Sequence, residues 1–147
     1  MKRTHVISLS IAAALMVVPA CGSLPRFEPV TLVGSSWTVS SYSTGEPEPR
    51  MPIDGSSLTA EFGEDGNVSG SSGCNSYSGT YEISGETVEF GEMISTLIAC
   101  IEPEGIMEQE ADFFKAMKNA ERFQLQGDLL VLFDSQGNRL VEFEANK

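Results

Sequence analysis

Cysteine and histidine are the residue types best suited to chemistry in this chain, and both are scarce. The sequence contains three cysteines, Cys21, Cys74 and Cys100, and one histidine, His5. A cysteine nucleophile needs a base to remove its proton, and histidine usually supplies that base. His5 belongs to an N-terminal segment that we expect to be removed, so no histidine would remain for a catalytic triad or a metal site. We therefore predict no catalytic residue, no metal site, no cofactor and no enzymatic activity.

The first 20 residues are typical of an export signal. A short basic start over residues 1–5 precedes an apolar run over residues 6–18. A run of this length is too short to span a bilayer as a helix and fits the apolar part of a signal peptide. We therefore predict a signal peptide over residues 1–20.

Cys21 lies where a lipid anchor could be attached. The motif Val18-Pro19-Ala20-Cys21 resembles the lipobox of bacterial lipoproteins, in which the cysteine becomes the lipidated first residue. Pro19 departs from that pattern, where a small or hydroxylated residue is more usual. An ordinary secretory signal with a chance cysteine is the alternative. We predict lipidation of Cys21, a tether over residues 21–31 and one folded domain over residues 32–147.

A lipidated Cys21 would place the protein in the cell envelope. Two or more acyl chains hold a protein stably on a membrane, whereas one chain binds only reversibly. Gly22 and Ser23 follow the cysteine without an aspartate. This resembles the sorting pattern for the outer membrane, on its periplasmic side, in a host with two membranes.

The two remaining cysteines, Cys74 and Cys100, are candidates for a disulfide. Exported proteins live where disulfides persist, and two cysteines remain if Cys21 carries lipid. A bridge between them would close a loop of about 27 residues, which contributes roughly 3–4 kcal/mol in the chain-entropy model. Two buried free thiols are the alternative.

The charge is strongly negative after residue 20. Seven of the nine basic residues and all 21 acidic residues lie there. Nucleic acid binding needs clustered cations, so we predict no nucleic-acid partner. The acidity either keeps the protein soluble or forms an acidic docking face. A pair of carboxylates with separated pKa values in one cleft stays open as an enzymatic alternative.

Short alternating stretches between turn residues predict antiparallel strands. Asp65-Gly66 and Ser84-Gly85 favour hairpin turns. In the first stretch Trp37, Val39 and Ser41 share one side. The candidate strands cover residues 37–42, 58–62, 67–73, 77–83, 87–90, 123–125, 129–133 and 140–143.

Residues 106–120 follow a helical apolar spacing, with Phe113, Met117 and Ala120 on one face. Acidic residues crowd its expected first turns and lysines its later ones, which suits the helix dipole; they are Glu102, Glu104, Glu108, Glu110, Lys115 and Lys118. The fold class is therefore mainly β (α+β). We expect a small antiparallel β-barrel-like sheet of about eight strands, partly open, with one late inserted helix over one end or face.

Several residues could define turns or bind a ligand. Gly73 and Asn75 flank Cys74 and tolerate positive φ, so they suit a sharp turn, while the Asn75 amide could instead bind a ligand. Trp37 is either a core residue or a sugar platform. Gly70 and Gly79 suggest bulges or close backbone contacts. We expect the remaining apolar residues of this region to line the core with Phe113 and Met117; they are Met93, Leu97, Ile98 and Ala99.

Five motifs occur in a fixed order: Leu32-Val33-Gly34-Ser35-Ser36-Trp37, Ser69-Gly70-Ser71-Ser72-Gly73-Cys74-Asn75-Ser76-Tyr77-Ser78-Gly79-Thr80-Tyr81, Met93-Ile94-Ser95-Thr96-Leu97-Ile98-Ala99-Cys100, Met107-Glu108-Gln109-Glu110-Ala111-Asp112-Phe113 and Leu129-Leu130-Val131-Leu132. Together they resemble the META domain family, also called HslJ-like, over residues 32–143. The resemblance implies a compact antiparallel β domain with a helix, often found in envelope lipoproteins. It also implies a link to heat shock, novobiocin tolerance, and virulence or secretion, and a fold similar to that of a lipid-binding pilotin.

Two functional hypotheses follow. The first is a non-enzymatic envelope lipoprotein that supports stress tolerance or surface and secretion-related interactions through an envelope protein partner. The alternative is a carrier that holds a lipid or another apolar small molecule inside the barrel. A carrier needs an apolar cavity of several hundred cubic ångströms, whereas an interaction module has a filled core and an exposed apolar patch.

Overall fold

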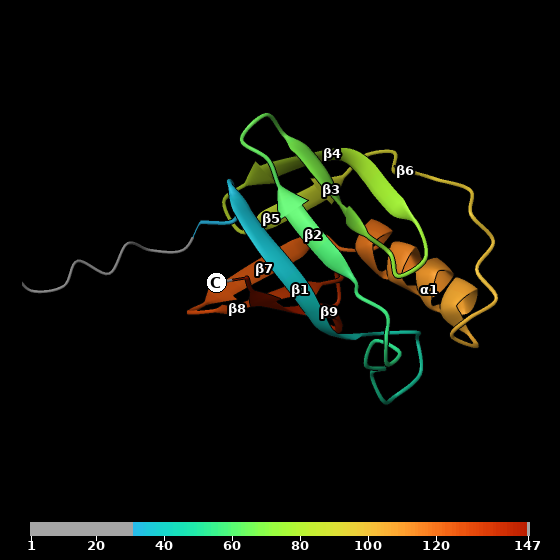
Figure 1. The fold of residues 1–147 in the computed structure, drawn as a ribbon. Helices are drawn as coiled ribbons and strands as arrows, with labels where there is room; N and C mark the ends of the chain where they lie inside the picture. The colour runs from blue at the N-terminus through green and yellow to red at the C-terminus, as the bar shows by residue number, and fades with distance from the viewer. Residues whose placement is uncertain (1–30, 147) are drawn as a thin grey trace, which may run out of the picture.

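Nine antiparallel strands and one helix make up the fold in the computed structural model, which describes residues 31–146 (Figure 1). The elements are β1 Ser35–Tyr42, β2 Thr59–Phe62, β3 Asn67–Ser71, β4 Ser76–Ser84, β5 Thr87–Phe90, β6 Ile94–Ser95, α1 Ile106–Lys118, β7 Arg122–Gln126, β8 Leu129–Phe133 and β9 Arg139–Ala145. The expected signal peptide, Cys21 and most of the expected tether fall outside the described residues.

Eight of the described strands close into a barrel, which confirms the mainly β fold with one helix. Neighbours follow the order β1, β2, β3, β4, β5, β7, β8 and β9, and β9 pairs again with β1. The ring is closed, not partly open as expected. Its thinnest seam joins β5 to β7, where Thr87 faces Arg122 and two flanking backbone bonds complete the contact. β6 lies outside the ring and pairs with β4.

The barrel interior is filled by side chains. Trp37, Phe62 and Phe143 from the strands meet Phe113 from the helix, and all four are fully buried. The phenol of Tyr77 also lies in this core, with its ring centroid 5.8 Å from that of Phe113, and its hydroxyl donates to the Thr59 carbonyl at 2.8 Å. Burial raises the pKa of Tyr77 well above its ordinary value of 10.0.

A bulge in β1 changes which residue faces this core. The pairing of β1 with β9 shifts register between Val39 and Ser41. Strict alternation would put Ser41 inside beside Val39, but the extra residue turns Tyr42 inward instead, where it is 2% exposed. The prediction for Ser41 was therefore wrong.

The helix α1 lies against one end of the barrel, and the described chain enters at the opposite end (Figure 1). Its buried Phe113 and Met117 insert into the core, as predicted. It ends at Lys118, slightly before the predicted Ala120, because the chain turns to begin β7. Glu102 and Glu104 precede the helix and do not belong to its first turn, contrary to expectation. Within residues 31–146 no helix has the length and apolar character needed to cross a membrane.

Candidate functional site

The disulfide between Cys74 and Cys100 forms as predicted. Its S–S distance is 2.07 Å and its Cα atoms are 6.0 Å apart. Cys74 lies in the turn that joins β3 to β4, and Cys100 lies in the chain that joins β6 to α1. The bridge therefore fastens the far end of residues 94–100 to the barrel.

Gly73 begins the turn beside this bridge. Its φ is +100°, a conformation that side chains rarely adopt, and an added Cβ would lie 2.6 Å from Nε2 of Gln109. Gly73 is therefore turn-defining, as predicted. Asn75 does not share that role, because no described residue other than glycine has a positive φ.

Asn75 positions the segment after β6 through its side chain. Its Oδ1 accepts hydrogen bonds from the Ile98 N–H at 2.8 Å and the Thr96 hydroxyl at 2.7 Å. Its Nδ2 donates to the Ile98 carbonyl at 3.1 Å and to Oε1 of Glu110 at 3.0 Å. The amide is 2% exposed and all four of its bonding positions are used inside the protein. Asn75 is therefore a positioning residue, with no bonding position left for a ligand.

Glu110 from the helix completes this buried network. Its Oε2 accepts from the Ser72 hydroxyl at 2.5 Å and from the Asn75 N–H at 3.1 Å. Buried polar groups are stabilising only when they are bonded in this way. The carboxylate therefore joins α1 to the turn that carries the disulfide.

Gln109, its neighbour, fastens a different loop. Its Oε1 accepts from the Ile53 N–H at 2.7 Å, and its Nε2 donates to the Ser56 hydroxyl at 3.0 Å. Sequence reasoning missed both buried polar residues of this helix. The helical spacing could have indicated their burial, because Gln109 and Glu110 lie three and four residues after Ile106, on the face of the helix that was expected to be apolar.

Trp37 is a core residue and not an exposed sugar platform. It is fully buried, and its indole N–H donates to the Ser35 hydroxyl at 2.6 Å. Gly70 and Gly79 lie at close contacts, as predicted: an added Cβ at Gly70 would lie 2.1 Å from the Thr59 carbonyl oxygen.

The segment that this network holds exposes large apolar side chains. Leu97 is 97% exposed, Ile101 87%, Ile94 66% and Ile98 58%. The prediction that Leu97, Ile98 and Ala99 line the core was therefore wrong, while Met93 does pack against it. Met107, in the first turn of α1, is 40% exposed. We call Ile94, Leu97, Ile98, Ile101 and Met107 the distal apolar surface.

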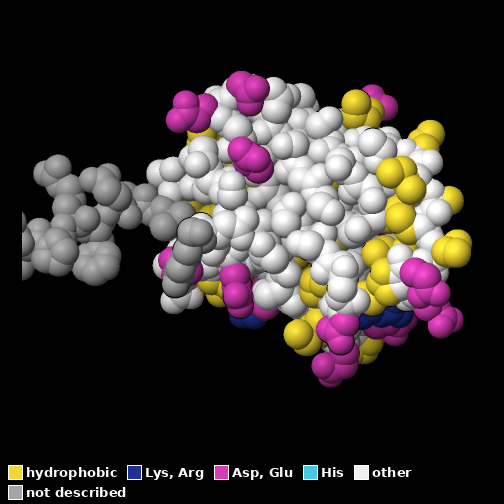
Figure 2. Space-filling model, in the orientation of Figure 1, with side chains coloured by type: hydrophobic (Ala, Val, Ile, Leu, Met, Phe, Trp, Pro, Cys, Tyr) yellow, Lys and Arg dark blue, Asp and Glu magenta, His cyan; other side chains and the backbone are white. Residues whose placement is uncertain are grey.

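The backbone explains why these side chains point outward. Pairing of Ile94 and Ser95 with β4, the Asn75 bonds and the disulfide all hold the main chain of this segment. The core at this end is already filled by the helix. Figure 2 shows hydrophobic side chains gathered at the right, over the chain after β6 and the start of α1, with acidic side chains beside them.

A family model for the META domain matches residues 30–147. The chain belongs to the META domain family. The match confirms the resemblance drawn from the five sequence motifs. No curated protein sequence matches the chain significantly.

Solved structures share the fold of this META domain. A protein from Burkholderia xenovorans, solved by NMR, has a TM-score of 0.65 and 22% identity, and the alignment covers 90% of this chain and 99% of that one. A duf4847 family protein from Bacteroides vulgatus, a crystal structure, has a TM-score of 0.55 and 19% identity, over 78% of this chain and 94% of that one. These likenesses support the barrel with a single helix.

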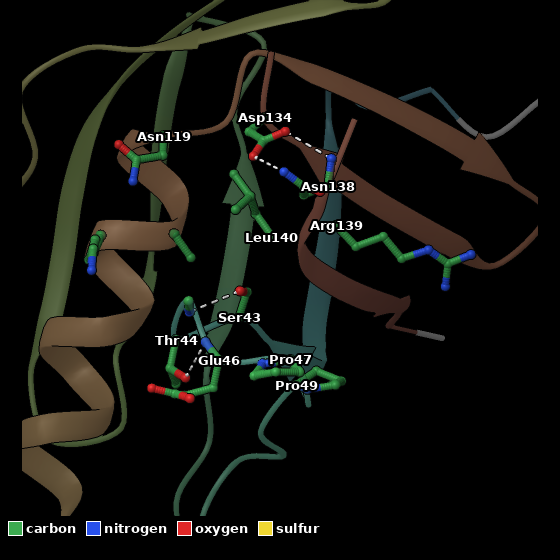
Figure 3. A pocket seen from close by; sticks show the side chains of 13 residues that line it. Ser43, Thr44, Glu46, Pro47, Pro49, Asn119, Asp134, Asn138, Arg139 and Leu140 are labelled. Atoms are coloured by element: carbon green, nitrogen blue, oxygen red, sulfur yellow. Dashed lines mark hydrogen bonds between the residues drawn. The ribbon is translucent and has the colours of Figure 1, made fainter. Parts of the chain in front are cut away.

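This META domain has a surface cleft of about 690 Å³ (Figure 3). It lies between the loop after β1, the end of α1 and the turn before β9. Several of its polar groups serve local turns: the Ser43 hydroxyl accepts from the Gly45 N–H, and Asp134 accepts from the Asn138 side chain at 2.8 Å. Arg139 points away from Asn119 in Figure 3 and pairs with Glu142 at 2.5 Å. The cleft is open, mixed in polarity and outside the barrel.

Chemistry-bearing groups are dispersed in the part of this META domain that is described. No three His, Cys, Asp or Glu side chains in residues 31–146 converge to hold a metal ion. The resolved carboxyl pKa shifts, at Asp65 and Asp134, are both downward and arise from hydrogen bonds within exposed turns. A general acid needs a pKa shifted in the opposite direction.

Proposed function

We propose that this META domain protein is a non-enzymatic lipoprotein of the cell envelope, anchored through Cys21, that acts by binding another protein through the distal apolar surface. The observation that carries the proposal is the exposure of Leu97 and Ile101 on a segment fixed by a disulfide and by Asn75. Exposed apolar patches mark contact sites, and a rigid patch loses little conformational entropy on binding.

The carrier alternative is less well supported. A carrier needs an enclosed apolar cavity, and the barrel interior is occupied by large side chains such as Trp37, Phe62, Phe113 and Phe143. The 690 Å³ cleft lies on the surface and carries charged side chains, so it does not match an apolar lipid site.

Anchoring is tested on the full chain in its own cells. Growth with a labelled fatty acid should label the wild-type protein in the membrane fraction, while Cys21→Ser should carry no label. An unlabelled wild-type protein in the cytoplasmic fraction would contradict the anchored role.

Contact through the surface is tested by complementation. A strain lacking the protein is challenged by heat and by novobiocin, the stresses that the family resemblance suggests. The wild-type gene should restore growth, whereas Leu97→Ser with Ile101→Ser should not, although that variant stays labelled and equally abundant. Thr80→Ser, an exposed change on β4, is the matched control. Full rescue by the double variant would contradict action through this surface.

A further inference from the structure

Charge is distributed unevenly around the distal apolar surface. Residues 51–114, which include β2 to β6 and most of α1, contain 13 acidic residues and no lysine or arginine. Beside the apolar side chains lie exposed carboxylates at Glu92, Glu102, Glu104 and Glu108. Arg50 reaches this end of the molecule, but its charge is already paired with Glu108 at 3.5 Å and Asp112 at 3.7 Å. The surface is therefore apolar at its centre and negative around it.

This pattern selects among possible occupants. A second copy of the chain would bring Glu102 and Glu104 against the same charges, which costs several kcal/mol in a well-matched interface. A bilayer with anionic head groups is repelled for the same reason. Moreover, the described chain enters at the opposite end of the barrel (Figure 1), so an anchor upstream of Thr31 would leave this surface facing away from the anchored end.

We propose that the occupant is a partner protein whose contact patch is apolar at its centre and flanked by lysine or arginine side chains. The inference rests on the proposed function and specifies the partner class. Leu97 and Ile101 are the anchors, since they expose the most apolar side chain and buried apolar anchors dominate contact energies. Glu102 and Glu104 meet the partner's cations and steer the encounter.

The test is site-specific photo-cross-linking of the full-length chain in its own cells, with p-benzoylphenylalanine placed at Leu97. The same probe at Glu82 is the matched control, because Glu82 is exposed on β4 and belongs to the same acidic stretch, residues 51–114. We expect an adduct with one protein from the Leu97 position and none from Glu82. Sequencing the adduct should map it to an apolar segment flanked by basic residues.

Two double variants, measured in the same cells, separate the contribution of the apolar side chains to binding from that of the carboxylates. Ile94→Ser with Ile101→Ser should lower the adduct yield by about tenfold, because the variant removes the anchor Ile101 and a second side chain of the distal apolar surface. Glu102→Gln with Glu104→Gln should lower it by about threefold, through slower association. Glu86→Gln with Glu89→Gln removes two charges elsewhere in residues 51–114 and should leave the adduct yield unchanged.

Other results overturn the inference. An adduct with a second copy of this chain, with lipid, or with an acidic segment excludes a basic protein partner, and so does the absence of any adduct. Equal loss from the Glu86 and Glu89 changes would show that net charge, not this surface, directs binding. An adduct with an acidic segment of another protein overturns this inference and leaves the proposed function standing. An adduct with lipid only, or the absence of any adduct, contradicts binding of a protein through this surface as well, while fatty-acid labelling of Cys21 tests the anchor independently.

Discussion

At the scale of single residues, Glu110 is expected to contribute more to stability than any exposed acid on the same helix. Glu110→Ala leaves the backbone N–H of Asn75 and one N–H of its side chain without an acceptor in a buried setting, at a cost of about 3 kcal/mol. Urea unfolding followed by circular dichroism measures this loss. Glu108→Ala is the control, because Glu108 is 68% exposed and its ion pair with Arg50 is worth less than about 1 kcal/mol. Equal losses for both variants would show that the buried network adds nothing.

We expect Asp65 to contribute to the pH dependence of the stability of the fold. The Asn67 side chain and then the Asn67 N–H donate to its carboxylate, and these bonds lower its pKa below the ordinary value of 3.8. A pKa lowered in the folded state stabilises the fold above the unfolded pKa, and this stabilisation is lost as the pH falls through the folded pKa. We expect the hairpin between β2 and β3 to loosen in that acidic range.

Carbon-detected NMR titration of the Asp65 carboxyl checks this prediction. Asp65→Asn should make unfolding less sensitive to pH in the same acidic range, and Asp134→Asn should act similarly, because the Asn138 side chain lowers the pKa of Asp134. A titration midpoint for Asp65 at or above 3.8 would rule out this contribution.

At the scale of elements, the disulfide should govern the segment between β6 and α1. Cys74→Ala with Cys100→Ala should lower the free energy of unfolding by roughly 3–4 kcal/mol, because the unfolded chain regains the entropy of a loop of about 27 residues. Amide hydrogen exchange should rise most over residues 94–100, which lose one of their fixed ends. Wild-type protein treated with a reductant should match the variant. Unchanged exchange in this segment would show that Asn75 and the β6 pairing hold it without the bridge.

The regular elements were largely predictable from the sequence, because their signals are local. Alternation and hairpin turns placed eight strand candidates, and apolar spacing placed the helix. The closure of the barrel was not predictable in this way, since pairing of β9 with β1 joins residues about a hundred positions apart. The bulge that turns Tyr42 inward is a similar case, because one extra residue reverses the alternation after it.

The candidate site was predicted only in part. The cysteine pair and Gly73 could be recognised from residue types, and Cys74 and Cys100 do bond. The exposure of Leu97 and Ile98 could not, because composition alone assigns apolar residues to the core. Their outward direction depends on Asn75, whose partner Glu110 lies 35 positions away in the sequence. Such partners become visible only when the fold brings the elements together.

At the scale of the whole molecule, the barrel is asymmetric: the distal apolar surface lies at the end covered by α1, with the exposed carboxylates of Glu102, Glu104 and Glu108 beside it. The cations of the described chain beyond Arg50 lie at the end of α1 and on β7 and β9; they are Lys115, Lys118, Arg122 and Arg139. A filled core accounts for stability without the distal apolar surface. That surface therefore exposes apolar area to water with no gain to folding, which is expected where binding requires it.

The exposed side chains of the distal apolar surface should contribute little to the stability of the fold. Leu97→Ser with Ile101→Ser should change the free energy of unfolding by less than about 0.5 kcal/mol, because both side chains are almost fully exposed in the native state. The same variant should bind less of a hydrophobic dye and stay soluble at higher concentration. Leu132→Ala, at a fully buried position on β8, should instead cost about 2–5 kcal/mol. Urea unfolding and dye fluorescence on the same samples measure both effects. A large loss of stability in the double variant would mean that Leu97 and Ile101 pack against the fold in solution, and the distal apolar surface would then belong to the core.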